Sequence, residues 1–508
     1  MLMKIFRLKV CIGLFLLIVI LSACNSENLI PLEEMTETPA PINTPEGIET
    51  VVTPTAELVE TQSSSQEVGE VIARQYHIQA VYDHGRKIVQ VKERIQYQND
   101  TGTPLDELVL IIEPNRYANG LDLISITRAG DEQNLGYQID LNRLQVDLNE
   151  KLEAMGSTEI DLEYTINLPQ IPPPSDMLKP QIFGYTARQT NLVDWFAFIP
   201  PYESGIGWVI HDPSYYGEFL VYPAANFELE LSITNKMLPL VVAACTIPIE
   251  ATEGYYRYSL SEGRNFALSL STDFQVRSEV VDGITILSYF FPFETRAGEA
   301  ALKNTAEAVV LYSNLFGDIQ RSSVSVVQAD FLDGMEYDGL YFLSKGFYNL
   351  YDGTPKGYLT AIAVHETAHQ WWYGIVANDQ AMEPWLDEAL STYSELLYYE
   401  HYYPELADWW WEYRVWFYEP QGKINRPVYD YRGFRPYRDA VYLNGAAFLQ
   451  DLRGLMGDDA FFGAIRGYLE ANRGKIAAGD DFFEVIFRYS DANIQTVIDQ
   501  YFSEGEDN

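Results

Sequence analysis

The sequence has few cysteines, few basic residues and few long apolar runs. Its 508 residues include three cysteines, and 34 Lys plus Arg stand against 73 Asp plus Glu, for a formal net charge of −39. We expect no nucleic-acid partner, because phosphate backbones are bound through clustered Lys and Arg. With Cys11 in the apolar N-terminal run and Cys24 assigned below to a lipid, Cys245 has no cysteine with which to form a disulfide.

One apolar run, at residues 10–21, follows three basic residues at the N-terminus. It is too short to span a bilayer comfortably, and this arrangement is typical of a signal peptide. The run ends in Leu-Ser-Ala-Cys, which resembles a bacterial lipobox in which Cys24 is lipidated; an ordinary secretory signal or a short anchor is the alternative. We therefore expect a lipoprotein signal peptide at 1-23 and an extracytoplasmic protein, lipid-anchored to a bacterial membrane.

The next segment, 24-70, contains five prolines, ten glutamates and no Lys or Arg. Such a composition cannot bury enough apolar surface to fold, and its like charges repel one another. We predict a disordered acidic tether that holds the folded part of the protein away from the lipid anchor.

Alternating apolar and polar residues begin near residue 74, which is the pattern of half-buried strands. Few helical patterns interrupt them, so residues 71-280 are predicted to form an all-β sandwich domain. The expected strands lie at 76–82, 88–97, 108–113, 137–148, 159–168, 219–221, 227–233, 255–260 and 266–271.

After a last clear strand at 284–290, apolar residues fall at helical spacing from 297 to 316. Short strands are expected at 324–329 and 341–343, and helix dominates to the end of the chain. We predict a mainly helical domain at 281-508, and hence an α+β protein with the β-sandwich domain first.

Residues 365–369 read His-Glu-Thr-Ala-His, an HExxH motif. Four residues turn a helix through about 400°, so both imidazoles project from one face and can supply two zinc ligands. Glu366 follows the first ligand directly and can take a proton from a zinc-bound water. Thr354 ahead of Pro355 is expected to cap this helix, and Gly374 to stop it. A surface helix with a His/Glu/His cluster is the alternative.

A catalytic zinc also needs a third protein ligand and an open position. Glu388 follows His369 by 19 residues in a stretch with helical spacing, so a helix-loop-helix can return it to His365 and His369. Glu395 lies two turns further along the same helix face, where it can accept a hydrogen bond from a ligand histidine and fix its tautomer. Taken alone, each glutamate could instead be solvated.

HExxH followed by Trp-Leu-x-Glu at this separation resembles the aminopeptidase N family of gluzincin zinc metallopeptidases. Upstream, Gly334-Met335-Glu336 resembles the core of that family's GxMEN signature, and downstream Tyr442 stands in a segment similar to Tyr-x-Lys-Gly-Ala. The resemblance implies that Glu336, with Gly334 and Met335, binds the free α-amino group of a substrate. It also implies that the Tyr442 hydroxyl stabilises the tetrahedral intermediate.

The resemblance has departures as well as matches. The first Gly of the signature is Asp333, its Asn is Tyr337, and the Lys after the tyrosine is Asn444. Only 66 residues follow Tyr442, so the long C-terminal helical domain of many members is expected to be missing. The β domain ahead of a thermolysin-like catalytic domain is the family's arrangement.

We therefore expect a zinc-dependent aminopeptidase that uses one Zn²⁺ per chain and acts on peptide substrates with a free N-terminus. The first alternative is a zinc endopeptidase with the same site. The second is a non-catalytic surface binding protein with a structural zinc, against which an intact Glu366 and a candidate Tyr442 argue, because a structural zinc requires neither.

Overall fold

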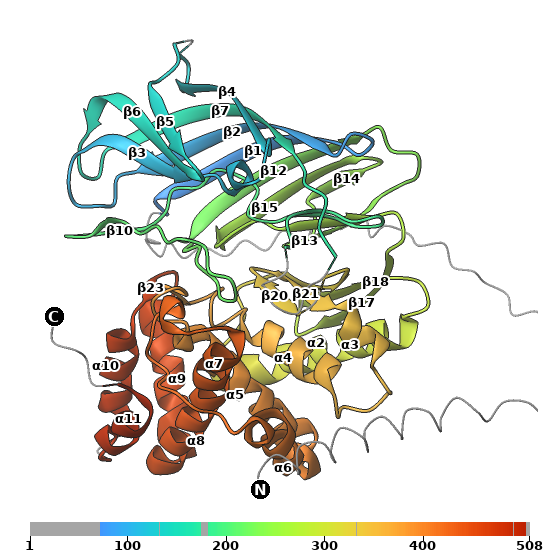
Figure 1. The fold of residues 1–508 in the computed structure, drawn as a ribbon, viewed down its shortest axis with the longest axis vertical. Coiled ribbons are helices and arrows are strands. Elements are labelled where there is room, and N and C mark those ends of the chain that lie inside the picture. The colour runs from blue at the N-terminus through green and yellow to red at the C-terminus, as the bar shows by residue number, and fades with distance from the viewer. Residues whose placement is uncertain (1–71, 132, 174–180, 332, 491, 504–508) are drawn as a thin grey trace, which may run out of the picture. The chain divides into compact units, whose positions relative to one another are not determined.

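The computed structural model describes residues 72–131, 133–173, 181–331, 333–490 and 492–503 (Figure 1). All of these residues belong to one compact unit. The expected signal peptide, the lipidated Cys24 and the acidic tether lie outside the described residues. In the described part, no helix combines the length and the apolar character needed to cross a membrane.

A seven-stranded sheet dominates the N-terminal half. Its neighbours are antiparallel except for β1 and β12, which run parallel. In sheet order the strands are β14 (Glu250–Thr252), β15 (Tyr255–Gly263), β12 (Ala225–Thr234), β1 (Arg74–Asp83), β2 (Ile88–Gln98), β7 (Ser157–Asn167) and β4 (Leu121–Arg128).

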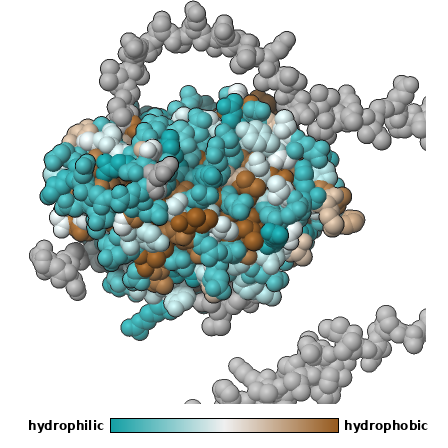
Figure 2. Space-filling view, turned by 90° about the horizontal axis from the view of Figure 1, so that it is seen from above, coloured by the Kyte–Doolittle hydropathy of each residue, from teal (hydrophilic) through white to brown (hydrophobic). Residues whose placement is uncertain are grey.

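Side chains alternate across this sheet as the sequence pattern predicts. Along β2, Val89, Val91, Glu93, Ile95 and Tyr97 are buried, while the residues that alternate with them are more exposed. The one charged side chain in the buried row of β2 is Glu93. Viewed from above, the molecule presents a largely hydrophilic surface with scattered hydrophobic patches (Figure 2).

Two smaller sheets share a buried core with the large one, which makes the layered β structure predicted from the sequence. The three-stranded sheet comprises β3 (Leu105–Ile111), β6 (Arg143–Leu152) and β5 (Tyr137–Asp140). The four-stranded sheet comprises β13 (Val241–Ala244), β16 (Leu268–Ser271), β9 (Thr190–Leu192) and β8 (Gly184–Tyr185). Minor elements are η1 (Glu113–Arg116), β10 (Tyr202–Glu203) and β11 (Gly207–Trp208).

A five-stranded mixed sheet begins the second half and lies between the β-rich and helical parts (Figure 1). Both faces of its central strands are buried: Val324 and Val326 pack among the helices, whereas Val327 packs against the core of the β-rich part. This explains why the central strands are richer in apolar residues than the exposed edge strand at 275–281. In sheet order the strands are β17 (Gln275–Val281), β18 (Ile284–Phe290), β19 (Ser323–Ala329), β21 (Leu340–Ser344) and β20 (Gly334–Tyr337).

Helices make up most of the remainder. The α-helices are α2 (Thr295–Phe316), α3 (Lys345–Asn349), α4 (Tyr358–Ala368), α5 (Trp385–Tyr402), α6 (Ala407–Trp410), α7 (Phe434–Arg438), α8 (Gly445–Met456), α9 (Asp458–Asn472), α10 (Gly479–Tyr489) and α11 (Gln495–Tyr501). Two π-helical segments, η3 (Trp411–Val415) and η6 (Asp439–Asn444), interrupt them. The short elements are η2 (Pro404–Leu406), η4 (Trp416–Tyr418), η5 (Val428–Asp430), β22 (Ala377–Asn378) and β23 (Ile476–Ala477).

The α+β fold class predicted from the sequence is confirmed, but several element predictions are wrong. Residues 219–221 form no strand, because this irregular segment contributes Phe219 and Leu220 to the wall of a small cavity. Residues 137–148 form two strands rather than one, because the chain turns at Leu141, whose φ is 51°. The expected domain boundary at 280 falls inside β17, which pairs with β18 in the five-stranded sheet.

Candidate metal and catalytic site

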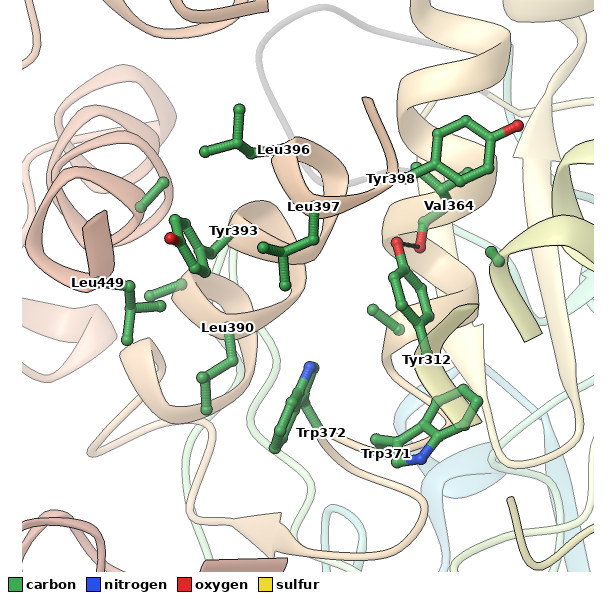
Figure 3. Packing of buried hydrophobic residues seen from close by; sticks show 14 of the residues in the cluster. Tyr312, Val364, Trp371, Trp372, Leu390, Tyr393, Leu396, Leu397, Tyr398 and Leu449 are labelled. Atoms are coloured by element: carbon green, nitrogen blue, oxygen red, sulfur yellow. Dashed lines mark hydrogen bonds between the residues drawn. The ribbon is translucent and has the colours of Figure 1, made fainter. Parts of the chain in front are cut away.

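Two buried helices carry the residues of the HExxH motif and the expected third ligand. The hydroxyl of Tyr312 on α2 lies 3.2 Å from the carbonyl oxygen of Val364 and 2.9 Å from that of Ser394. These carbonyls immediately precede His365 on α4 and Glu395 on α5. Figure 3 shows Tyr312 beside Val364, packed within the core between the helices. Tyr312 therefore links α4 and α5 at the positions just before His365 and Glu395.

The bounds of α4 differ from those expected. It begins at Tyr358 after Gly357, and the Thr354 hydroxyl donates instead to Asp352 in a local turn. It ends at Ala368 with His369 as its C-cap, so the stop comes before Gly374. The amide of Gly374 returns to the carbonyl of His369 at 2.9 Å, which closes the turn after the helix.

The structure brings His365, His369 and Glu388 together around one point. The Nε2 atoms of the two histidines lie 3.2 Å apart. Oε2 of Glu388 lies 3.2 Å from Nε2 of His365 and 3.6 Å from Nε2 of His369. All three side chains are buried, and their nearest ligand atoms lie within 4.8 Å of one another. Two imidazoles and a carboxylate are the ligand set of many catalytic zinc sites.

The other ring nitrogen of each histidine has an acceptor. Nδ1 of His365 lies 3.0 Å from Oε1 of Glu395, and Nδ1 of His369 lies 3.1 Å from the carbonyl oxygen of Trp372. A carbonyl oxygen can only accept, so His369 donates from Nδ1, and in the neutral ring its Nε2 keeps the lone pair that can bind a metal. Each ring is thus oriented with Nε2 toward Glu388.

Glu366 lies on α4 beside the edge strand β20, with a carboxylate oxygen within 4.8 Å of ligand atoms of His369 and Glu336. A Cβ added to Gly334 would lie 2.1 Å from Oε1 of Glu366, so only glycine leaves room for this carboxylate. Oε2 of Glu366 is buried and has no hydrogen-bond partner among the described protein atoms. This oxygen of Glu366 is therefore available to accept a proton from a molecule bound in the site.

Glu336 lies on β20, next to a small cavity of about 60 Å³. Gln380 donates to Oε1 of Glu336 at 2.9 Å and to Asp387 at 2.6 Å, so one amide links the signature strand to α5. Met335 and Tyr337 also line the cavity, together with Glu218 from the β-rich half. Tyr337, which replaces the signature Asn, donates its hydroxyl to Asp194 at 3.4 Å.

Tyr442 reaches the site from the π-helical segment η6. Its hydroxyl donates to Oε1 of Glu388, and its ring stacks on that of His365 with centroids 5.9 Å apart. A Cβ on Gly445 would lie 2.4 Å from Cβ of Ala389, so α8 approaches α5 closely just beyond η6. Asn444, in place of the family's Lys, donates to the carbonyl of Gly422.

The site holds more negative charge than its side chains neutralise. Burial would lower the pKa of His369, but the carboxylates of Glu336, Glu388 and Glu366 raise it well above its usual value. Burial, followed by the charges of Glu336 and Glu388, likewise raises the pKa of Glu366. Burial also raises the pKa of Tyr442, which keeps its hydroxyl a donor. The donor set, the excess charge and the unpaired Oε2 of Glu366 all fit a divalent cation such as Zn²⁺.

The larger cavity lies elsewhere. It measures about 650 Å³ and is lined by polar residues of the seven-stranded sheet. Within its lining, Arg94 on β2 and Asp161 on β7 lie directly opposite each other and form an ion pair at 2.7 Å. Its lining includes none of the residues of the HExxH site.

Sequence reasoning did not single out several neighbours of the site. Asp387 and Gln380 lie close to Glu388 in the chain, and the Trp-Leu-Asp-Glu segment could have drawn attention to Asp387. Glu218 comes from a segment about 150 residues upstream of the motif, so only folding brings it near, with an oxygen within 4.8 Å of Glu336 and Glu388 oxygens. Arg414, which contacts Glu395, follows no motif either.

Comparison with known proteins gives one domain match. Residues 318–501 match the Peptidase family M1 domain. Aminopeptidase N of Lactobacillus delbrueckii subsp. lactis is 25% identical over 158 residues, which cover 28% of this chain and 18% of that protein. Human endoplasmic reticulum aminopeptidase 1 is 23% identical over 272 residues, covering 50% of this chain and 28% of that protein. The chain thus spans less than a third of either relative.

Solved structures resemble the chain over more of its length. An M1 zinc metallopeptidase from Deinococcus radiodurans aligns with a TM-score of 0.60 at 16% identity, covering 86% of this chain and 95% of that one. A mutant of that enzyme bound to a Tyr-Ser-Ala substrate aligns with a TM-score of 0.59 at 17% identity, covering 85% and 94%. At this identity the likeness establishes the fold shared by the two chains.

Proposed function

Residues 318–501 form an aminopeptidase N-like domain of peptidase family M1, and on that premise we propose that this protein is a zinc-dependent aminopeptidase. It would remove N-terminal residues from peptides with a free amino terminus. The observation that carries the proposal is the convergence of His365, His369 and Glu388 on one point, with Glu366 beside them. One Zn²⁺ per chain would be held by the Nε2 atoms of the histidines and by the Glu388 carboxylate.

A bound zinc supplies Lewis-acid chemistry, polarising a peptide carbonyl and easing the deprotonation of water. The Glu366 carboxylate accepts a proton from the attacking water and delivers it to the departing amine. The Tyr442 hydroxyl, which donates to Glu388 in this structure, donates to the oxyanion that develops on the scissile carbonyl. Each step therefore uses a side chain that the fold already holds in the site.

The choice of an aminopeptidase depends on Glu336. Its carboxylate is buried beside the small cavity and is held by the Gln380 amide, with Glu218 close by. A peptide ammonium inserted there would meet carboxylates on two sides, which favours the charged amine over a blocked terminus. The Tyr-Ser-Ala peptide bound by the Deinococcus enzyme is a short substrate of the same chemical class.

The test compares one peptide in free and N-acetylated forms. We expect the wild type to cleave the free form and to leave the acetylated form largely intact. Glu336→Gln should raise KM for the free form while zinc content stays unchanged, because the variant loses the charge partner of the ammonium. Equal cleavage of both peptides would identify an endopeptidase instead. Zinc binding without any hydrolysis would identify a non-catalytic binding protein.

We also propose that the protein acts outside the cytoplasm, lipid-anchored to a bacterial membrane at Cys24. The support is the basic start, the apolar run and the Leu-Ser-Ala-Cys sequence at its end. In cells, Cys24→Ser should move the protein from the membrane fraction to the soluble extracytoplasmic fraction. A wild-type protein found in the cytoplasm contradicts this part of the proposal.

A further inference from the structure

The carboxylate of Glu395 is surrounded by nitrogen atoms of three side chains. Nδ1 of His365 lies 3.0 Å from Oε1, and Nη2 of Arg414 donates to the same oxygen at 2.8 Å. Nε of Arg414 and Nε1 of Trp410 donate to Oε2 at 2.9 and 3.0 Å. Glu395 and Trp410 are fully buried, and Arg414 is 6% exposed. Every lone-pair direction of this carboxylate is therefore used.

We propose that Arg414, assisted by Trp410, is a positioning residue for the metal site and acts through Glu395 on His365. The inference rests on the proposed zinc site, and it assigns a role to side chains of a segment that contributes no metal ligand. Arg414 touches Glu395, and Glu395 touches His365, so the influence passes through two hydrogen-bonded contacts.

The direction of these hydrogen bonds fixes the form of the His365 ring. Arginine and the indole of tryptophan can only donate, and the positive charge of Arg414 at 2.8 Å favours Glu395 as an ionised carboxylate. A carboxylate that carries no proton can only accept from His365 as well. Nδ1 of His365 therefore holds the hydrogen, and Nε2 keeps its lone pair, pointed at Glu388 and His369.

The planar guanidinium adds geometric control that a single donor lacks. Nε and Nη2 of Arg414 contact different oxygens of Glu395, which fixes the plane of the carboxylate. Since Oε1 is shared with His365, that plane also sets the tilt of the imidazole. Trp410 holds the second oxygen from one helical turn away.

The local backbone of Arg414 is unusual in the same way as that of Tyr442. Arg414 lies in η3 and Tyr442 in η6, the π-helical segments assigned in the described part of the chain. Such segments are rare and occur frequently at functional sites. One reaches Glu388 through Tyr442, and the other reaches Glu395 through Arg414. Glu388, a proposed metal ligand, and Glu395, which orients His365, are thus each contacted from a π-helical turn.

The test measures zinc affinity of the full chain by competition with a chelator, and thermal unfolding of the metal-free protein. We expect Arg414→Met to weaken zinc binding by about 10–100-fold, the usual effect of losing an outer hydrogen-bonding partner. Trp410→Phe should weaken it less, in the same direction. The matched control is Arg321→Met, because Arg321 forms a similarly buried ion pair with Asp338 and, among the described residues, does not donate to Glu395.

Arg414→Lys covers the case in which Arg414→Met does not fold. Lysine keeps the positive charge beside Glu395 but cannot donate to both of its oxygens at once, as Nε and Nη2 of Arg414 do. We therefore expect a folded protein with weakened zinc binding. Arg321→Met should lower the unfolding temperature and leave zinc affinity unchanged.

Wild-type zinc affinity in Arg414→Lys and Trp410→Phe would overturn the proposal. It would also be overturned if Arg321→Met weakened zinc binding as much as Arg414→Met. A wild-type chain that binds zinc but cleaves no peptide contradicts the proposed function alone, so the two failures are distinguishable.

Discussion

At the scale of single residues, the side chains of the site are buried and their orientations are restricted by their neighbours. His369 is oriented by a main-chain carbonyl, His365 by a carboxylate, and Glu366 by the missing side chain of Gly334. Each constraint removes an alternative rotamer, so the chemistry does not depend on a ligand to arrange it. Tyr442 is the least constrained of the set, because its hydroxyl must change partner during the reaction.

Tyr442→Phe tests that role. Removing the hydroxyl should lower kcat by about 10²–10³-fold, the usual cost of losing one oxyanion donor. Zinc content should stay unchanged, since all three ligand side chains and the ring of Tyr442 remain in place. Steady-state kinetics and metal analysis on the same sample provide the measurement.

Tyr437→Phe is the matched control for this experiment. The ring of Tyr437 lies 5.7 Å from that of Tyr442, and its hydroxyl is buried without a hydrogen-bond partner among the described atoms. Its loss should leave kcat nearly unchanged. If both variants lost activity equally, a role specific to Tyr442 would be excluded.

The sequence was most informative about residues with fixed spacing. HExxH predicts two histidines on one helix face, and the structure places both there. The pairing of Glu395 with His365 also follows from a spacing of two turns. Arg414 and Glu218 could not be chosen, because an acid or an arginine outside a motif gives no spacing signal. Their partners become evident only after folding.

At the scale of elements, the site depends on how closely helices approach. Gly445 lets the start of α8 pack against Ala389, the neighbour of Glu388. That contact places η6, and with it Tyr442, over the ligand on α5. A larger residue would push the two elements apart and move both functional groups.

Gly445→Ala should therefore lower both stability and activity. Its Cβ would lie 2.4 Å from that of Ala389, and such overpacking typically costs about 1–3 kcal/mol. Denaturant unfolding and kcat are the measurements. Gly454→Ala, in the same helix, meets no atom within 4 Å and should instead raise stability by up to about 1 kcal/mol. Unchanged kcat in Gly445→Ala would refute the proposed link between helix packing and Tyr442.

The elements themselves were predictable where the period was clear. β1 begins at Arg74 and α2 spans Thr295–Phe316, close to the expected positions. The N-cap of α4 was not predictable, because a threonine before a proline can either cap a helix or form a local turn. The hydroxyl of Thr354 donates to Asp352 in a turn. Segment 219–221 is apolar like a strand, but its apolar side chains line a cavity instead of pairing in a sheet.

At the scale of the whole molecule, the β-rich half and the catalytic half are joined through the five-stranded sheet and through Arg264. This buried arginine donates to the carbonyls of Gly374, Ile375, Gly474 and Lys475, all in the catalytic half. No sequence pattern predicts these hydrogen bonds between the two halves. The loop after His369 is therefore held by a side chain from the other half.

The β-rich half also predicts a pH dependence of stability. Burial raises the pKa of Glu93 from 4.5 to about 8, although Tyr164 and the amide of Ala197 donate to its carboxyl. Between these values the folded protein holds a proton that the unfolded chain releases. The free energy of unfolding should therefore fall as pH rises from about 4.5 to about 8, by up to about 5 kcal/mol.

Glu93→Gln isolates this effect, because glutamine can accept the same two hydrogen bonds and does not titrate. Denaturant unfolding at pH 5 and pH 8 should show similar stabilities at the lower pH and a more stable variant at the higher pH. Parallel loss of stability in both proteins would show that Glu93 is not the titrating group.

The measurement that tests the central claim most directly is a zinc titration of metal-free protein, followed by the rate of hydrolysis of an aminoacyl substrate. We expect no hydrolysis without metal and full activity at one equivalent of zinc per chain. His369→Ala should regain no activity over the same range, because the proposed site would lack a ligand. Hydrolysis by the metal-free wild type, or recovery in His369→Ala equal to that of the wild type, would contradict the account.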